Sequence, residues 1–579
     1  MQTLSLDSSD SCEKPYPNGI SSDAISLSSI EDWFVQGNYT SVAMAGVSDL
    51  WQTYAAYGLI GKTDAAIEGL QRFTHADARF YLATAYWIGG QDQQAISILQ
   101  NLDNAFAKNL LRLILKPCIE VLGQLMWRRG GSQDLVSGAL ADSKFLIRNL
   151  SFHPEDTPYG PYEDVHSLYD QQNSPDFYIC QMAEWHVIPP NIQELPCPIF
   201  GQSADYDLHI QAVYPWLCMF DEMLVTDGTE WQDIKQLVSV PVSTFPKSFG
   251  LPDSLPPPPI DGRALDVFWS GTITHPYHPD KARLIQSVFN TPGIKTLMVN
   301  GFLPKAEYFT MLGKTKAVFT FYRHSGGMVT RGLEALAMGC GLVVQKNSVL
   351  KLFAGEEHGV LTYENAEELS KAINRIVAAW PDFEQRAQSG AQHIRNEFGL
   401  PKVASQYLRF LTVLAAKPRP LRTTMRSRHQ PNQKRSVLCK GALPDIHQRR
   451  YELMEGNIDH WIPQLRQAST VHSFIDMARE LVLWGFSISD VSEYESFFRQ
   501  AFDLYRLGLK RFPDSLVLRV NFIRVALYFG GETEVSDALK LAEETVLCEQ
   551  SSWVVDPLED VLFYYSGDSF HYCQCSVFL

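Results

Sequence analysis

Long apolar runs are missing from this sequence of 579 residues, and none approaches the ~20 residues that a membrane-spanning helix needs. The start of the chain, Met1 to Asp7, has no basic group and no apolar core, so we expect no secretory signal. Cysteine is sparse: ten residues are scattered mostly singly, and only Cys573 and Cys575 form a close pair. This predicts reduced thiols in a cytoplasmic protein. A metal site at Cys573 and Cys575 is the alternative, although no second Cys or His pair has ligand spacing.

Basic residues are also in the minority, 49 against 65 acids, which gives a net charge of −16. Segment 417–450 is the exception, with ten Lys or Arg and a single acid, Asp445. The acidic remainder argues against general nucleic-acid binding. The basic segment contains several prolines and few apolar residues, so we interpret it as a solvated linker. Contact with anionic lipid headgroups, as a peripheral membrane contact, is the second interpretation.

The length is too great for one hydrophobic core and predicts several domains. The expected divisions are a disordered N-terminus (1–35), a helical region (36–140), two α/β units (141–255 and 261–416), the basic linker (417–450) and a C-terminal helical region (451–579).

Both helical regions contain repeat-like patterns. In the first, Tyr54, Tyr57, Ala66 and Leu70 recur 29 residues later as Ala83, Tyr86, Ala95 and Leu99. In the second, Ala501, Tyr505, Gly508 and Pro513 follow the spacing A-x3-Y-x2-G-x4-P. Both patterns resemble degenerate tetratricopeptide repeats, in which small residues let paired helices approach closely. An ordinary helical core explains the same spacing, and a partner-binding role is left open.

Short apolar runs separated by polar segments predict two parallel sheets. The runs lie at 145–147, 176–180, 198–200, 223–225 and 240–242 in the first unit and near 266–269, 295–299, 317–321 and 342–345 in the second. The proline-rich stretch 255–260 is a stiff connector between the units. A helix over 403–415 is expected to close the second unit. The first unit is about 110 residues long, which is short, and the N-terminal helices are expected to complete it.

The most informative stretch is 324–339, which reads HSGGMVTRGLEALAMG between two of these apolar runs. Strand, glycine-rich turn, helix and strand make one parallel βαβ step. Backbone N–H groups of Ser325, Gly326 and Gly327 at a helix N-terminus would suit a phosphate. Glu334 would then lie near a ribose hydroxyl. An ordinary crossover helix is the alternative.

This stretch resembles the donor-binding segment of GT-B glycosyltransferases, in particular the CgeB-like group with its pattern R-G-x-E-A-x-A-x-G-C. The matching residues are Arg331, Gly332, Glu334, Ala335, Ala337, Gly339 and Cys340. The resemblance extends over 264–415, a domain of the glycosyltransferase family 1 type. It implies an α/β GT-B fold of two Rossmann-like domains, the first short, with helical repeats at both ends. Many GT-B enzymes carry a second glutamate eight positions earlier, where this chain has Gly326.

In open α/β sheets, ligands bind beyond the carboxyl ends of the strands. The expected donor-site residues are Gly271 and Thr272 at the diphosphate, Asn300 at the base, His324, Ser325, Gly326 and Gly327 in the phosphate turn, Arg331 against the diphosphate charge, and Glu334 at the ribose. A surface or interdomain salt bridge is the alternative role for Arg331. On the acceptor side, His186, Asp205 and Asp207 follow strands and are possible catalytic bases; each could equally be a surface or hydrogen-bonded group.

The leading hypothesis is a metal-independent enzyme without a resident cofactor. It transfers a sugar from a nucleotide-diphosphate sugar to a hydroxyl on a protein or glycan. The resemblance also implies that a helix dipole and basic side chains, rather than a metal, stabilise the leaving diphosphate. A catalytically inactive GT-B-like scaffold whose repeats bind a protein partner is the second hypothesis. A nucleotide-sugar epimerase is the third, and the flanking repeats argue against it.

Overall fold

A computed structural model gives the fold of the chain. The structure describes residues 26–125, 134–151, 155–159, 164–170, 173–183, 186, 188–189, 192–203, 220–238, 240–259, 262–271, 279–300, 303–322, 326–419, 474, 478, 481, 491–515, 518–519, 522–523, 525–526 and 531–548. None of the described helices combines the length and the apolar character needed to cross a bilayer.

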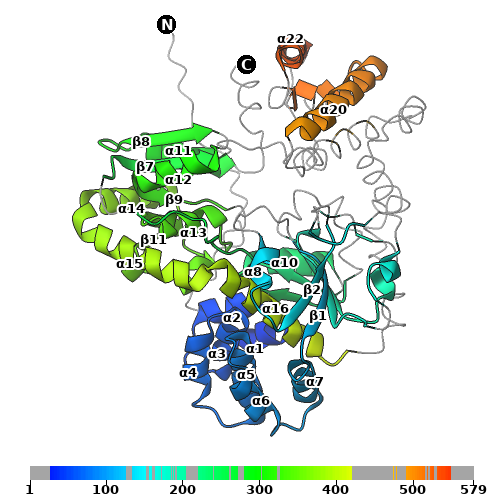
Figure 1. The fold of residues 1–579 in the computed structure, drawn as a ribbon. Helices are drawn as coiled ribbons and strands as arrows, with labels where there is room; N and C mark the ends of the chain where they lie inside the picture. The colour runs from blue at the N-terminus through cyan, green and yellow to red at the C-terminus, as the bar shows by residue number, and fades with distance from the viewer. Residues whose placement is uncertain are drawn as a thin grey trace.

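The N-terminal region is helical (Figure 1). Its helices are α1 (Leu27–Val35), α2 (Tyr39–Ala45), α3 (Trp51–Leu59), α4 (Thr63–Leu70), α5 (Ala76–Ile88), α6 (Asp92–Leu99) and α7 (Ala105–Ile114). Helices α3 and α4 pack as one pair and α5 and α6 as the next. The 29-residue repeat therefore corresponds to two successive helix pairs. Ala66 and its counterpart Ala95 are fully buried, and a Cβ on Gly58 would lie 3.1 Å from the Cβ of Ala85, so small residues mark the close contacts.

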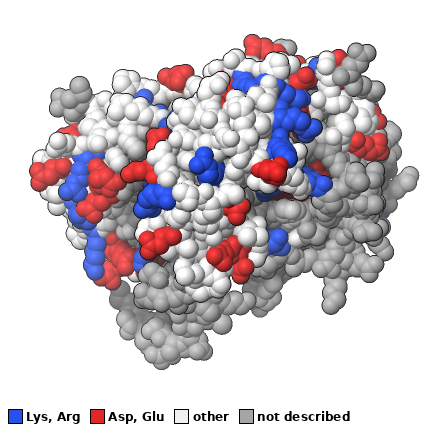
Figure 2. Space-filling view, turned by 90° about the horizontal axis from the view of Figure 1, so that it is seen from below, with Lys and Arg blue, Asp and Glu red and all other residues white. Residues whose placement is uncertain are grey.

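Acidic and basic groups are interspersed over most of the molecular face seen from below, with one gathering of Lys and Arg (Figure 2). Lys108 and Arg112 on α7 and Lys116 just after it line a shallow hollow together with two leucines. Lys108 and Lys116 each pair with an aspartate, so this basic stripe is partly neutralised.

The first α/β domain contains a six-stranded parallel sheet in the order β2-β1-β3-β4-β5-β6. Its strands and helices are β1 (Ile119–Gln124), α8 (Leu135–Ala139), β2 (Phe145–Asn149), β3 (Phe177–Cys180), β4 (Ile199–Gln202), β5 (Glu222–Val225), α10 (Gly228–Leu237) and β6 (Val242–Thr244). Strand β1 lies where the sequence predicted helices up to residue 140. Because β1 supplies the second strand of the sheet, this domain is larger than expected.

The second α/β domain contains a five-stranded parallel sheet in the order β11-β10-β9-β7-β8. Its elements are β7 (Leu265–Gly271), α11 (Pro279–Phe289), β8 (Thr296–Asn300), α12 (Lys305–Gly313), β9 (Thr315–Phe319), α13 (Thr330–Ala337), β10 (Gly341–Gln345), β11 (Val360–Tyr363), α14 (Ala366–Ala378), α15 (Trp380–Phe398) and α16 (Leu400–Ala416). Two parallel sheets in separate domains, preceded by helices, confirm the expected fold class. Strand β11 was not predicted.

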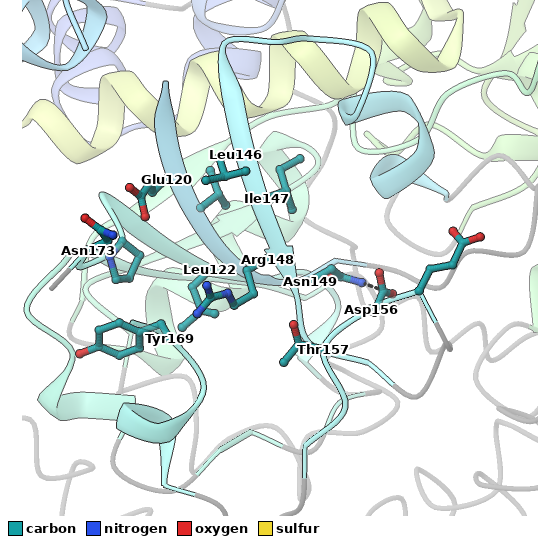
Figure 3. Close-up of a pocket in the computed structure, with 13 residues that line it drawn as sticks. Glu120, Leu122, Leu146, Ile147, Arg148, Asn149, Asp156, Thr157, Tyr169 and Asn173 are labelled. Carbon is teal, nitrogen blue, oxygen red and sulfur yellow. Dashed lines mark hydrogen bonds between the residues drawn. The ribbon is translucent and has the colours of Figure 1, made fainter. Parts of the chain in front are cut away.

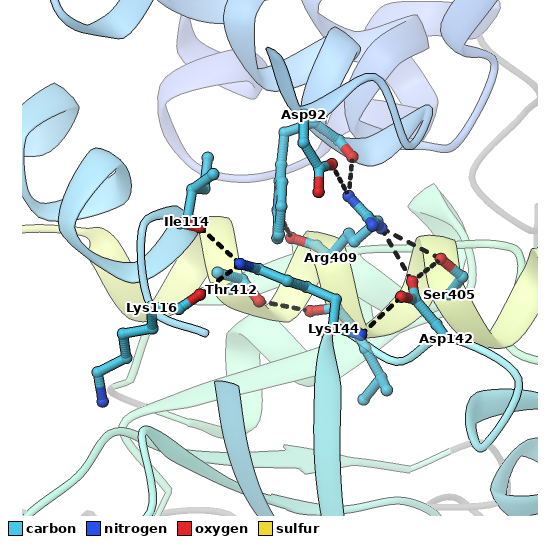
Figure 4. Close-up of polar contacts among 10 residues, drawn as sticks. Asp92, Ile114, Lys116, Asp142, Lys144, Ser405, Arg409 and Thr412 are labelled. Carbon is cyan, nitrogen blue, oxygen red and sulfur yellow. Dashed lines mark hydrogen bonds and ion pairs between the residues drawn. The ribbon is translucent and has the colours of Figure 1, made fainter. Parts of the chain in front are cut away.

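The helix predicted over 403–415 is α16, which leaves the second domain and packs against α5, α7 and α8 (Figure 1). Arg409 on this helix is buried and lies 3.1 Å from Oδ2 of Asp142; it also pairs with Asp92 (Figure 4). Its guanidinium stacks 4.2 Å from the ring centroid of Trp87. Arg409 therefore joins α16 to the N-terminal helices and to the loop before β2 of the first domain in one polar cluster.

Lys247, which follows β6, is completely buried at the junction of three regions. Its Nζ donates to the Gly61 carbonyl at 3.0 Å, to Oε1 of Gln406 at 3.0 Å and to Oε2 of Glu397 at 3.0 Å. Burial lowers the pKa of Lys247 to about 8, although the Glu397 carboxylate opposes this shift. One ammonium group thus holds the N-terminal helices, the first domain and helices α15 and α16 together.

Two C-terminal helices are described, α20 (Val491–Arg511) and α22 (Glu532–Cys548). Ala501 and Tyr505 on α20 are fully buried, and a Cβ on Gly508 would lie 3.1 Å from the Phe474 ring. The predicted small-residue pattern therefore faces a helical core. Residues 1–25 and most of the basic segment lie outside the described residues.

Candidate active site

Both sheets have doubly wound strand orders, and in such sheets a crevice forms where consecutive connections leave toward opposite faces. In the second domain, the neighbouring strands β7 and β9 mark this switch point. Gly271 ends β7, and residues 320–322 follow β9. A ligand bound by the second domain is therefore expected beside Gly271.

Gly271 and Arg331 lie in direct contact at this crevice. Gly271 has φ +131°, and a Cβ there would be 2.6 Å from Nη2 of Arg331. The guanidinium stacks over the Trp269 ring at 5.3 Å, which fixes it above the end of β7. Arg331 is in the first turn of α13, whose N-terminus has no side-chain cap. A cation beside uncapped helix N–H groups is suited to an anion such as a diphosphate.

Glu334 lies one turn further along α13, on the same face as Arg331. Burial raises the pKa of Tyr308 well above its usual value, the Glu334 carboxylate raises it further, and Arg331 opposes the rise. Arg331 and Glu334 are three residues apart on α13 and therefore lie on one face of the helix, and Tyr308 is near enough for both charges to act on it. The structure therefore brings the predicted residues Gly271, Arg331 and Glu334 into one cluster, and it adds Tyr308 and Trp269, which were not predicted as site residues.

The predicted phosphate turn lies before α13. The helix begins at Thr330, so Gly326 and Gly327 precede its first turn, and phosphate binding by this turn stays a prediction. A Cβ on Gly327 would lie 1.8 Å from Cδ1 of Tyr322, which shows that glycine is needed there for the tyrosine ring. The backbone N–H of Gly326 donates to Oγ1 of Thr229 in the first domain at 3.4 Å.

Gly326 is also the position at which the GT-B pattern carries an acid. A Cβ at this position would lie 2.7 Å from Oδ1 of Asp227, a buried residue of the first domain. Asp227 caps α10 by accepting from the N–H of Thr229 at 2.7 Å. A larger side chain at 326 would collide with this cap, which gives a physical reason for the departure from the pattern.

On the acceptor side, His186 is buried after β3, and its backbone N–H donates to the Ala183 carbonyl at 3.4 Å. This places it within the protein rather than on the surface. Met182, between His186 and β3, has φ +53°, a left-handed conformation that is uncommon for a residue with a side chain. Asp205 and Asp207 lie outside the described residues.

Other predicted donor residues are only partly described. Asn300 ends β8 and pairs with Gly271 across the sheet, so its backbone lies at the expected edge. Thr272, His324 and Ser325 lie outside the described residues. Their roles stay predictions.

A separate cavity of about 240 Å³ lies beside β1 and β2 of the first sheet (Figure 3). Its lining combines Arg148 with the carboxylates of Glu120, Glu155 and Asp156. Asp156 accepts from Nδ2 of Asn149 at 2.7 Å. None of the predicted site residues lines it.

A known protein family matches part of the second α/β domain. Residues 279–409 match a family model described as glycosyl transferase-like. This segment contains Arg331 and Glu334, so the chain carries a glycosyltransferase-like domain. No match was found among curated proteins.

Similar solved structures include a mutant of the O-GlcNAc transferase of Thermobaculum terrenum, with 11% identity over 68% of this chain and 97% of that chain and a TM-score of 0.35. The sucrose-phosphate synthase of Thermosynechococcus elongatus has 13% identity over 52% of this chain and 100% of that chain, also with a TM-score of 0.35. TarM has 11% identity over 40% of this chain and 54% of that chain, with a TM-score of 0.29.

Proposed function

We propose that this protein transfers a sugar from a nucleotide-diphosphate sugar to a hydroxyl group on a protein or glycan. The observation that supports this most strongly is the cluster of Gly271, Arg331 and Glu334 at the β7/β9 switch point. The glycine lets the diphosphate approach the backbone, the guanidinium offsets its charge, and the carboxylate accepts hydrogen bonds from ribose hydroxyls.

The same cluster supports a mechanism without a metal ion. As the bond between sugar and diphosphate breaks, negative charge grows on the leaving phosphate. Arg331 and the uncapped N-terminus of α13 are the groups available to stabilise it. His186, Asp205 and Asp207 remain the proposed candidates for a base that accepts the proton of the acceptor hydroxyl.

The experiment is a donor-hydrolysis assay with the purified full chain, UDP-, GDP- and dTDP-sugars, and EDTA. Release of the nucleoside diphosphate from at least one donor in EDTA would support a metal-independent transferase. Release only after a divalent cation is added would contradict the metal-independent mechanism. Nucleotide binding without any release would favour the second candidate, an inactive scaffold, which is also consistent with the missing acid at Gly326.

A further inference from the structure

Two residues outside the donor cluster connect the α/β domains across their facing edges. The Tyr322 hydroxyl, after β9 of the second domain, donates to Oε1 of Glu230 on α10 of the first domain at 2.9 Å. Glu230 is fully buried, and its Oε2 accepts from the N–H and the hydroxyl of Thr226 at 2.8 and 2.7 Å. Glu230 is therefore a fixed acceptor in the first turn of α10, beside Thr226, which follows β5.

Tyr322 is also held in place by contacts within the second domain. Its backbone N–H donates to Oε1 of Gln345, the last residue of β10, at 2.8 Å. Its ring fills the space that a side chain at Gly327 would need. The tyrosine thus belongs to the second domain through its backbone and ring and contacts the first domain through its hydroxyl.

We propose that Glu230 and Tyr322 are positioning residues, which set the distance between the donor-binding domain and the acceptor-side domain during sugar transfer. This inference rests on the proposed function. The nucleotide contacts proposed above all come from the second domain, whereas the reacting sugar must meet groups of the first. The interdomain hydrogen bond should therefore affect turnover much more than nucleotide affinity.

The test compares Tyr322→Phe with wild type in the full-length chain. This substitution removes the hydroxyl and keeps the ring that packs on Gly327. We expect the Kd for UDP, GDP or dTDP to change less than twofold, while kcat for donor hydrolysis falls by about tenfold, since small misplacements of reacting groups are costly. A matched control is Tyr363→Phe, which removes a 2.9 Å hydrogen bond to the Thr320 carbonyl within the second domain alone and should leave kcat unchanged.

Several outcomes would overturn the inference. An unchanged kcat in Tyr322→Phe excludes a positioning role, and so does a similar fall in Tyr363→Phe. Wild-type protein that binds no nucleotide refutes the proposed function instead. In that case a double-mutant cycle in urea, with Glu230→Ala and Tyr322→Phe, still tests the hydrogen bond, because each substitution removes one of its two partners. Additive effects in that cycle would show that Glu230 and Tyr322 do not join the domains.

Discussion

Arg331 occupies the space in which a side chain on Gly271 would have to lie: a Cβ at position 271 would be 2.6 Å from its Nη2. Gly271 also has φ +131°, which only glycine adopts readily. We therefore predict that Gly271→Ala displaces the guanidinium and weakens nucleoside diphosphate binding by about tenfold, the loss of one charge-assisted hydrogen bond. Isothermal titration calorimetry measures this change.

Gly293→Ala is the matched control for backbone strain. Gly293 has φ +78°, and nothing lies within 4 Å of a Cβ there. This variant should lose stability through strain alone, by about 1 kcal/mol, and keep its nucleotide affinity. Equal affinities in both variants would mean that Arg331 does not bind the diphosphate.

Glu334→Gln should weaken nucleotide binding without unfolding the chain. A hydrogen bond from a ribose hydroxyl to a carboxylate contributes about 1.5–3 kcal/mol, so the Kd should rise roughly 10- to 100-fold. Glu356→Gln changes an exposed glutamate of the same domain and should have no effect on binding. Loss of the fold in Glu334→Gln would show that the carboxylate supports Tyr308 and Arg331 structurally instead.

Arg409→Met should be strongly destabilising, because it leaves Asp92 and Asp142 without their buried partner. Breaking a buried ion pair from one side costs about 3–5 kcal/mol. Arg375→Met removes an exposed arginine that pairs with Glu356 and should cost at most about 1 kcal/mol. Urea unfolding compares the two variants, and similar losses would show that the Arg409 cluster does not hold α16 in place.

The buried Lys247 predicts an unusual response to alkaline pH. Its pKa is lowered to about 8, whereas an unfolded lysine titrates near ~10.4. Between these values the unfolded chain binds more protons, so the contribution of Lys247 to stability rises with pH. From pH 8 to 10, wild type should gain on the order of 2 kcal/mol relative to Lys247→Met in urea unfolding. Parallel changes in both proteins would place the pKa of Lys247 near its ordinary value.

Strands and helices were predicted correctly where their own residues form a clear apolar pattern. Phe177–Cys180 is a continuous apolar run and is indeed a buried strand. Strand β1 follows the amphipathic helix α7 with only a short break, so its helical surroundings obscured it. Strand β11 is four residues long and has an exposed Thr362, which left no recognisable apolar run.

In the candidate site, too, residues that share one local motif were predicted, whereas residues that act across domains were not. Arg331 and Glu334 were identified because they belong to one motif on one helix. Asp227 and Glu230 were not predicted because their contacts are with residues of the second domain, and no motif in the neighbouring sequence indicates such contacts. The reason for glycine at 326 likewise became visible only when Asp227 was placed against it.

The most direct test of the proposed donor site is nucleotide binding by the full chain in the absence of divalent metal. At UDP, GDP or dTDP concentrations about 100-fold above Kd, the domain that contains Arg331 and Glu334 should be stabilised by roughly 2.7 kcal/mol, seen as a rise in Tm. The rise should be lost or much reduced in Glu334→Gln. Absence of any Tm change with all three nucleotides at millimolar concentration would contradict the assignment of a nucleotide-sugar donor site to this chain.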